Sequence, residues 1–139
     1  YGFPAIIVEL KPQSVKTFFA NPINLLKSVN GFLIIGNSDS IEQEFLLERF
    51  DELIIGIGYK HIEIRKKMYE RFDGKIPFGK IIHSSSWIDK STKIGMGCVI
   101  YPRCIIDSNV VIENNTIINI GCVVAHDTRI QNHCRKKHP

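Results

Sequence analysis

The sequence lacks the features that mark several whole classes of protein. Its 139 residues contain no apolar run near the roughly 20 residues that span a bilayer, so we expect no membrane-spanning helix. No charged-then-apolar leader follows Tyr1, so we expect no signal peptide. The net charge of +4 is small and comes partly from residues 135–137, which argues against nucleic-acid binding. With 44% apolar and 23% charged residues, the chain is expected to be neither disordered nor fibrous.

The spacing of the cysteines excludes a further kind of site. The chain has four cysteines and no Cys-x-x-Cys pair, so the spacing typical of a zinc site is missing. In a chain without a signal peptide, four thiols point to a reducing compartment. We therefore expect a cytoplasmic protein with free cysteines.

Residues 1–80 alternate between short apolar runs and amphipathic stretches. Strands are predicted at 33–35 and 53–57, each closed by glycine, and helices at 41–50 and 61–72. Strand–helix–strand–helix spacing predicts a small parallel α/β sheet, Rossmann-like and incomplete. A further helix is expected at 5–10, stopped by Pro12, and a further strand at 15–19.

Residues 81–134 follow a different period. Every sixth residue from Ile82 to Ile130 is a β-branched aliphatic, and the residue four positions later is small. This hexapeptide period predicts a parallel β-helix of about three coils, with the aliphatic and small side chains inside. All four cysteines occupy the small position, where a buried thiol behaves as a small hydrophobe. The period breaks after Cys134, so residues 135–139 are expected to form an irregular tail.

One outward column of this β-helix is expected to be covered. If three hexapeptides make one coil, residues 18 apart stack, and Trp87, Ile105 and Val123 form an apolar outward column. An exposed stripe of this kind usually marks an interface. Two covering surfaces are open: the first domain, or a symmetry-related copy of the same face.

The chemistry-bearing residues are few. His126 and Asp127 are adjacent at a corner of the repeat, where a carboxylate can fix the imidazole tautomer for a general base. Asn119 stands seven residues earlier, at a neighbouring corner, where its amide can orient another group. In the first domain, the turn containing Gly56 and Gly58 opens a helix whose N–H groups suit an anion, and Arg65 lies one turn into that helix.

Over residues 31–134 the chain resembles the hexapeptide-repeat sugar acetyltransferases of the sialic-acid O-acetyltransferase and bacillosamine-pathway N-acetyltransferase type. The matching stretches are 31–40 (GFLIIGNSDS), 53–65 (LIIGIGYKHIEIR), 81–83 (IIH) and 118–127 (INIGCVVAHD). The last is the most specific, because the family carries an Asn and then a His–acid pair at this spacing.

The resemblance implies a nucleotide-sugar-binding α/β domain, here residues 1–80, and a left-handed β-helix, here residues 81–134. It also implies acetyl-CoA as co-substrate, a sugar or nucleotide-linked amino sugar as acceptor, and a homotrimer with its site between subunits. On this reading His126 is the general base and Asp127 orients it. Gly56, Gly58, Arg65 and Asn119 are the substrate-binding candidates.

The chain departs from the family pattern at both ends. Tyr1–Ala5 stands where the family has a strand and a glycine-rich loop, and Ala20–Asn21 where it has an Asp pair. Lys136 occupies the next aliphatic position, which indicates a truncation or a shifted reading frame. An inactive truncated β-helix fragment or scaffold of the same family is therefore the alternative.

We predict no metal cofactor. Some left-handed β-helix enzymes, such as the gamma-class carbonic anhydrases, hold zinc with three histidines. The one comparable set here is His126, His133 and His138, and His138 lies in the tail that has lost the repeat.

Overall fold

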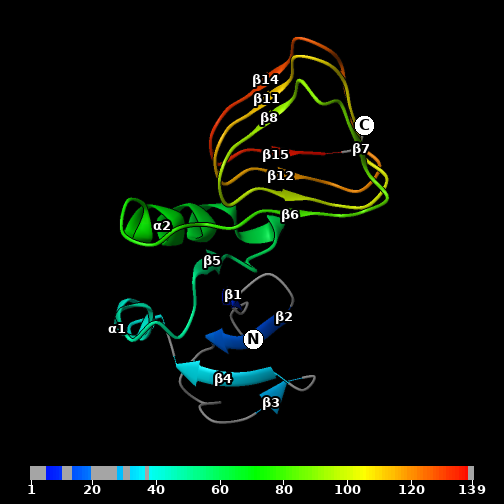
Figure 1. The fold of residues 1–139 in the computed structure, drawn as a ribbon. Coiled ribbons are helices and arrows are strands. Elements are labelled where there is room, and N and C mark those ends of the chain that lie inside the picture. The colour runs from blue at the N-terminus through cyan, green and yellow to red at the C-terminus, as the bar shows by residue number, and fades with distance from the viewer. Residues whose placement is uncertain (1–5, 11–13, 20–27, 30–31, 37, 138–139) are drawn as a thin grey trace. The chain divides into compact units, whose positions relative to one another are not determined.

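The computed structural model describes residues 6–10, 14–19, 28–29, 32–36 and 38–137. The chain divides into two compact units, which Figure 1 shows as a ribbon. The first unit is Tyr1–Gly58 with Lys67–Gly79, and the second is Tyr59–Lys66 with Lys80–Pro139. Each unit is described by itself below.

The first unit contains a five-stranded mixed sheet in the order β3-β4-β2-β1-β5. The strands are β1 (Ile6–Leu10), β2 (Ser14–Phe19), β3 (Ser28–Val29), β4 (Phe32–Gly36) and β5 (Glu52–Ile54). Only β2 and β4 pair in parallel, and the other three pairings are antiparallel.

The predicted parallel sheet therefore holds only for the β2–β4 pair, which matches the strands predicted at 15–19 and 33–35, and is wrong for the other three pairings. Three residues join β1 to β2 and two join β3 to β4, whereas a parallel pair needs a crossover of about a dozen residues or more. The predicted helix at 5–10 is wrong too, because Ile6–Leu10 is a strand that opens with β-branched residues. The strand predicted at 15–19 is confirmed by β2.

The helices match the amphipathic stretches. Helix α1 (Ile41–Leu46) is shorter than the predicted 41–50, since Glu48 takes a left-handed φ of 55° just after its end. The 3-10 turn η2 (Tyr59–His61) and helix α2 (Ile62–Phe72) confirm the predicted helix at 61–72. The core of the first unit includes the buried side chains of Ile41, Phe50, Leu53, Ile55 and Phe72.

The second unit is a parallel β-solenoid of about three coils, as predicted (Figure 1). Its two-residue strands recur every six residues: β6 (Ile81–Ile82), β7 (Trp87–Ile88), β8 (Lys93–Ile94), β9 (Val99–Ile100), β10 (Ile105–Ile106), β11 (Val111–Ile112), β12 (Ile117–Ile118), β13 (Val123–Val124), β14 (Arg129–Ile130) and β15 (Arg135–Lys136). They form three parallel sheets, β13-β10-β7, β14-β11-β8 and β15-β12-β9-β6. Paired residues are 18 apart, as in Ile105 opposite Val123.

The corners of the solenoid depend on a left-handed residue. From position 97 to 133, every sixth residue has a φ between 55° and 70°: Gly97, Arg103, Asn109, Asn115, Gly121, Asp127 and His133. Glycine and, among other residues, Asn and Asp adopt this conformation at least cost, and five of these seven positions carry one of the three. The sequence therefore encodes the turns as well as the strands.

Aliphatic and small side chains fill the solenoid as predicted. Cys98, Cys104 and Cys122 are buried in its core beside Ile106 and Ile118, and each is a free thiol. Burial falls toward the two ends, where Ile82 is exposed and Cys134 is intermediate. The expected irregular tail is wrong at Arg135–Lys136, which form β15: the main chain pairs with β12 without needing an aliphatic side chain.

The buried thiols lead to a labelling prediction. Burial raises the pKa of Cys98 and Cys122, and the Sγ of Cys104 donates to the carbonyls of Tyr101 and Asn119 at 3.1 Å. A thiol-specific reagent should therefore modify Cys134 first in native protein, and the other three only after unfolding. Mass spectrometry of timed digests measures the order. Rapid labelling of Cys104 or Cys122 in folded protein would contradict the inward placement.

Candidate functional site

The candidate site is the corner between β13 and β14, residues 125–128. Here the side chains of His126 and Asp127 are 68% and 66% exposed, so both are open to a substrate. Asp127 holds the left-handed position of the corner with φ 59°, and its N–H donates to the Ser108 carbonyl of the preceding coil at 3.0 Å. The main chain of the site is thus fixed by the solenoid.

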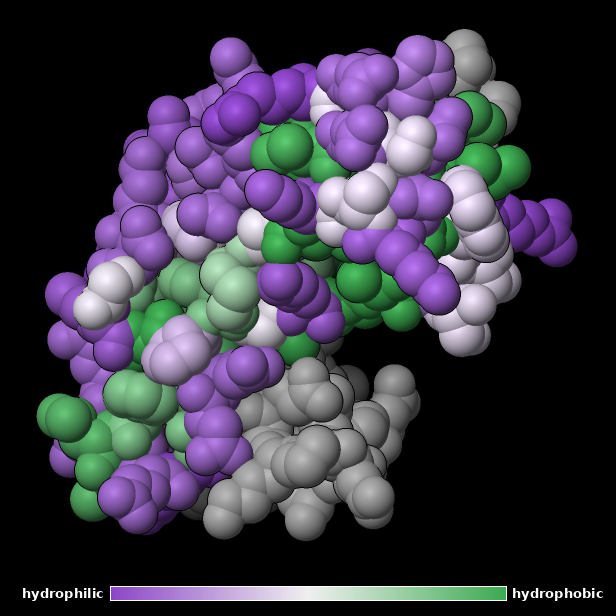
Figure 2. Space-filling model, turned by 45° about the horizontal axis from the view of Figure 1, so that its top comes forward, coloured by the Kyte–Doolittle hydropathy of each residue, from purple (hydrophilic) through white to green (hydrophobic). Residues whose placement is uncertain are grey.

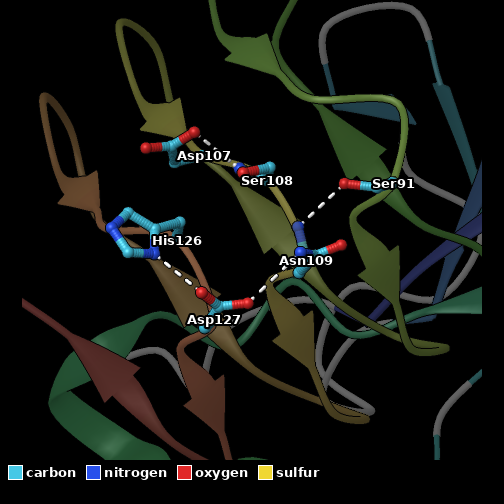
Figure 3. Close-up of polar contacts among 6 residues, drawn as sticks. All are labelled: Ser91, Asp107, Ser108, Asn109, His126 and Asp127. Atoms are coloured by element: carbon cyan, nitrogen blue, oxygen red, sulfur yellow. Dashed lines mark hydrogen bonds and ion pairs between the residues drawn. The ribbon is translucent and has the colours of Figure 1, made fainter.

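The two side chains form a hydrogen-bonded pair (Figure 3). The Nδ1 of His126 lies 2.7 Å from Oδ2 of Asp127. Because a carboxylate accepts, this nitrogen carries the proton, and Nε2 of the neutral ring is left with its lone pair. The arrangement suits a general base that works through Nε2.

The electrostatics of the corner favour a charged imidazole. The hydrogen bond with Asp127, the charge of that carboxylate and the charge of Asp107 raise the pKa of His126 above its ordinary value. Hydrogen bonds with His126 and Asn109 lower the pKa of Asp127. Asp127 is therefore ionised at neutral pH, and His126 can hold a proton that it has taken.

The site has a third member that the sequence pattern did not single out. Asn109 occupies the equivalent position of the preceding coil, and its Nδ2 donates to Asp127 Oδ1 at 3.2 Å (Figure 3). Its own N–H donates at 2.8 Å to Oγ of Ser91, which belongs to the coil before that. The signal that could have found it is the 18-residue stacking of positions 91, 109 and 127.

The structure gives the other candidates different surroundings. Asn119 starts the preceding corner, where its N–H donates to Lys136 O at 3.1 Å; within the described part of the chain no hydrogen bond joins it to His126 or Asp127. Gly56 is exposed and Gly58 half-buried in the turn before η2, and both belong to the first unit. A Cβ added to Gly58 would meet no atom within 4 Å.

Arg65 is buried rather than solvated. Only 1% of it is exposed, and its Nη2 donates to the carbonyl of Gly97 in the solenoid at 2.7 Å. Burial lowers the pKa of Arg65 to about 10, which still leaves it charged at neutral pH. This contact ties the start of α2 to a solenoid corner inside the second unit.

The described residues also bear on three other possibilities: a metal-binding group, a membrane-spanning helix and a groove. Among the described residues, no group of three or more His, Cys, Asp or Glu side chains could hold a metal ion, and His138 lies outside that part of the chain. In the same part, no helix has the length and apolarity to cross a membrane. An open groove of about 390 Å³ follows sheet β14-β11-β8 and is lined by Lys93, Ile94, Gly95, Val111, Ile112, Glu113, Asn114 and Asn132, not by the His–Asp pair.

Known structures share this fold. The acetyltransferase domain of PglB from Neisseria gonorrhoeae is similar with a TM-score of 0.70 and 22% identity, over 92% of this chain and 56% of that one. PerB from Caulobacter crescentus, solved with CoA and GDP-perosamine, gives 0.69 and 25%, over 78% of this chain and 51% of that one. A histidine-to-alanine variant of the GDP-perosamine N-acetyltransferase from that organism gives 0.70 and 23%, over 80% and 52%.

The chain thus spans about half the length of these solved proteins. Neither a protein-family model nor a curated protein matches the sequence. The predicted resemblance to sugar acetyltransferases is confirmed at the level of the fold: the structural neighbours include an acetyltransferase domain and a perosamine N-acetyltransferase.

Proposed function

We propose that the protein transfers the acetyl group of acetyl-CoA to a sugar, with a nucleotide-linked amino sugar as the first acceptor to test. The observation that carries this proposal is the His126–Asp127 pair, hydrogen-bonded at 2.7 Å on an open solenoid corner. The fold it shares with PerB, which was solved with CoA and GDP-perosamine, supports the substrate class. The left-handed winding of the solenoid and a cytoplasmic location, which suits the free thiols, belong to the same proposal.

In the proposed reaction His126 acts as general base. The acceptor nitrogen or oxygen attacks the thioester carbonyl while Nε2 of His126 takes its proton, and the C–S bond then breaks to release CoA. Asp127 keeps the ring in the Nδ1–H tautomer and balances the imidazolium charge. General-base help of this kind contributes about 10²–10⁴-fold. No covalent enzyme intermediate is needed, so the buried cysteines take no part.

The roles proposed for the remaining candidates follow from their places in the chain. The turn at Gly56 and Gly58 offers main-chain N–H groups to an anionic part of the substrate. Asn119 offers an amide at the neighbouring corner. Arg65 is proposed to act indirectly, because its guanidinium already donates to Gly97 O.

The proposed assembly is a homotrimer that covers the apolar column. Trp87, Ile105 and Val123 follow one sheet and are 56%, 49% and 61% exposed. Figure 2 shows one face of the molecule, where apolar side chains reach the surface between hydrophilic ones. The column ends at Val123, three residues before His126, so a copy seated there would stand beside the site.

Charge in this column should dissociate the assembly. Val123→Glu would bury an unpaired carboxylate at the contact, which costs several kilocalories per mole unless the surfaces separate. We expect a lower mass by sedimentation than for the parent protein. Lys93→Glu, a change to the same residue on an outward position of another sheet, should leave the mass unchanged. If Val123→Glu had the same mass as the parent protein, this column would not be part of the subunit interface.

The pH dependence should report the His–Asp pair. The base must be neutral, and Asp127 raises the pKa of His126, so kcat/KM should rise with pH through a midpoint above 6.5. In Asp127→Asn the pKa of His126 falls, so the rise moves to lower pH while the plateau drops. Asn tolerates the left-handed φ of 59° at this position, which keeps the corner intact. If kcat/KM rose at the same pH in both proteins, Asp127 would not influence the pKa of the catalytic base.

A CoA-release assay tests the proposed function. Purified protein is mixed with acetyl-CoA and a panel of nucleotide-linked amino sugars, together with matched sugars carrying hydroxyl in place of the amine. We expect release of CoA with at least one acceptor, and the panel separates N- from O-acetylation. The absence of release with every acceptor would contradict the proposal and favour the inactive scaffold.

A further inference from the structure

The His126–Asp127 pair needs an anchor beyond itself. Both side chains are about two-thirds exposed, so the hydrogen bond between them orients each relative to the other without fixing either to the solenoid. A carboxylate has two oxygens, and His126 uses only Oδ2. The contact of the second oxygen therefore decides how well the pair is held.

Asn109 supplies that contact from the preceding coil. Its Nδ2 donates to Asp127 Oδ1 at 3.2 Å, and residues 109 and 127 occupy equivalent left-handed positions of stacked corners, with φ of 57° and 59°. Asn109 is itself held, because its N–H donates to Ser91 Oγ at 2.8 Å and that hydroxyl donates to Asp89 Oδ1 at 2.6 Å. Figure 3 shows the chain of contacts from Ser91 through Asn109 to Asp127 and His126.

We propose that Asn109 is a positioning residue: it fixes the Asp127 carboxylate through Oδ1, so that Oδ2 holds the proton of His126 on Nδ1 and Nε2 faces the acceptor as base. For its catalytic consequence this inference rests on the proposed function. Asp107 is the other charged group acting on His126; its Oδ1 accepts from the Ser108 N–H at 2.7 Å. Among the described residues the hydrogen bond of the His126 ring is with Asp127 and not with Asp107. The Asp127 carboxylate, held by Asn109, therefore sets the tautomer.

A simpler role for Asn109 would be to build the corner. Arg103 provides the matched comparison, because it has the same left-handed conformation (φ 61°) in the same coil, and its N–H also donates to a serine Oγ, that of Ser85, at 3.1 Å. Replacing either residue by glycine preserves the turn. Only the Asn109 change removes a contact with Asp127.

The test reads the tautomer of His126 by nitrogen NMR of the ring in the folded chain, at a pH where the ring is neutral. We expect the Nδ1–H form in the parent protein and in Arg103→Gly, and a shift toward Nε2–H in Asn109→Gly. Asn109→Asp keeps the size and tolerates the left-handed turn but cannot donate, so it should shift in the same way. The signal is assigned by its loss in His126→Ala.

Two results would overturn the inference. One is an unchanged tautomer in both Asn109 variants, and the other is an equal shift in Arg103→Gly. In an active protein, Asn109→Gly should also lower kcat by about 10-fold with little change in KM, the effect typical of a group that orients another. Because the NMR readout needs no turnover, a tautomer shift without any acetyl transfer would refute the proposed function and leave the positioning role standing.

Discussion

Replacing His126 by alanine should lower kcat by at least about 10²-fold and leave the affinity for acetyl-CoA nearly unchanged. The imidazole takes a proton only as the acceptor attacks, so its loss is felt in the transition state and not in the binding of the thioester. The side chain is 68% exposed and makes its hydrogen bond with an exposed neighbour, so the fold should tolerate the change. Asp127→Asn should cost less, because the imidazole remains.

The matched control for this experiment is His83→Ala. His83 is also exposed on a solenoid corner, and its Nδ1 lies 2.9 Å from Ser85 Oγ, so it presents an imidazole without a carboxylate partner of this kind. Rates and acetyl-CoA binding of the two variants are compared by CoA release and calorimetry. Equal turnover in His126→Ala and in the parent protein would show that His126 is not the general base.

The second large effect is expected on stability. Ile112 is 1% exposed in the core of the solenoid, on the central strand β11 of its sheet. Ile112→Ala should lower the free energy of unfolding by about 2–5 kcal/mol, because it removes buried methyl groups and leaves a cavity between coils that relax only in part.

Val111→Ala provides the comparison within the same strand. Val111 points outward and is half-buried, and its truncation removes two carbons where Ile112→Ala removes three, so it should cost much less. Denaturant unfolding of both variants gives the two values. A larger loss for Val111 than for Ile112 would mean that the inward and outward faces of the repeat have been exchanged.

The solenoid could be predicted because its sequence repeats a local rule. Each six-residue unit places one aliphatic and one small side chain inside, and the left-handed residue at each corner is usually Gly, Asn or Asp. Nine such units agree with one another, so no single substitution obscures the period. Lys136 shows the limit: its main chain still pairs in β15 although its side chain breaks the pattern.

The fold of the first unit was harder to predict, because strand pairing there depends on contacts between residues that are distant in the sequence. The stretch Ile6–Leu10 reads as a possible helix in isolation, yet it lies between β2 and β5 in the sheet. Two short connections make hairpins, and these override the pattern of alternating strands and helices. The burial of Arg65 could not be predicted for a similar reason, since a helical arginine next to acidic and basic neighbours gives no sign that it will be buried against Gly97.

Only part of the candidate site could be predicted from the sequence. The adjacency of His126 and Asp127 is local, and the 2.7 Å contact confirms that they pair. The contribution of Asn109 comes from stacking across 18 residues, which becomes visible only when the columns of the solenoid are compared.

The most direct test of the central claim, that chemistry takes place at the corner of residues 125–128, is an NMR titration of His126. Ring signals of the histidines are followed as acetyl-CoA and then GDP-perosamine are added, with the His126 signal assigned from His126→Ala. We expect the His126 signals to shift in a saturable manner while those of His83 stay in place. Saturable binding of both ligands with unmoved His126 signals would mean that the reaction takes place away from residues 125–128.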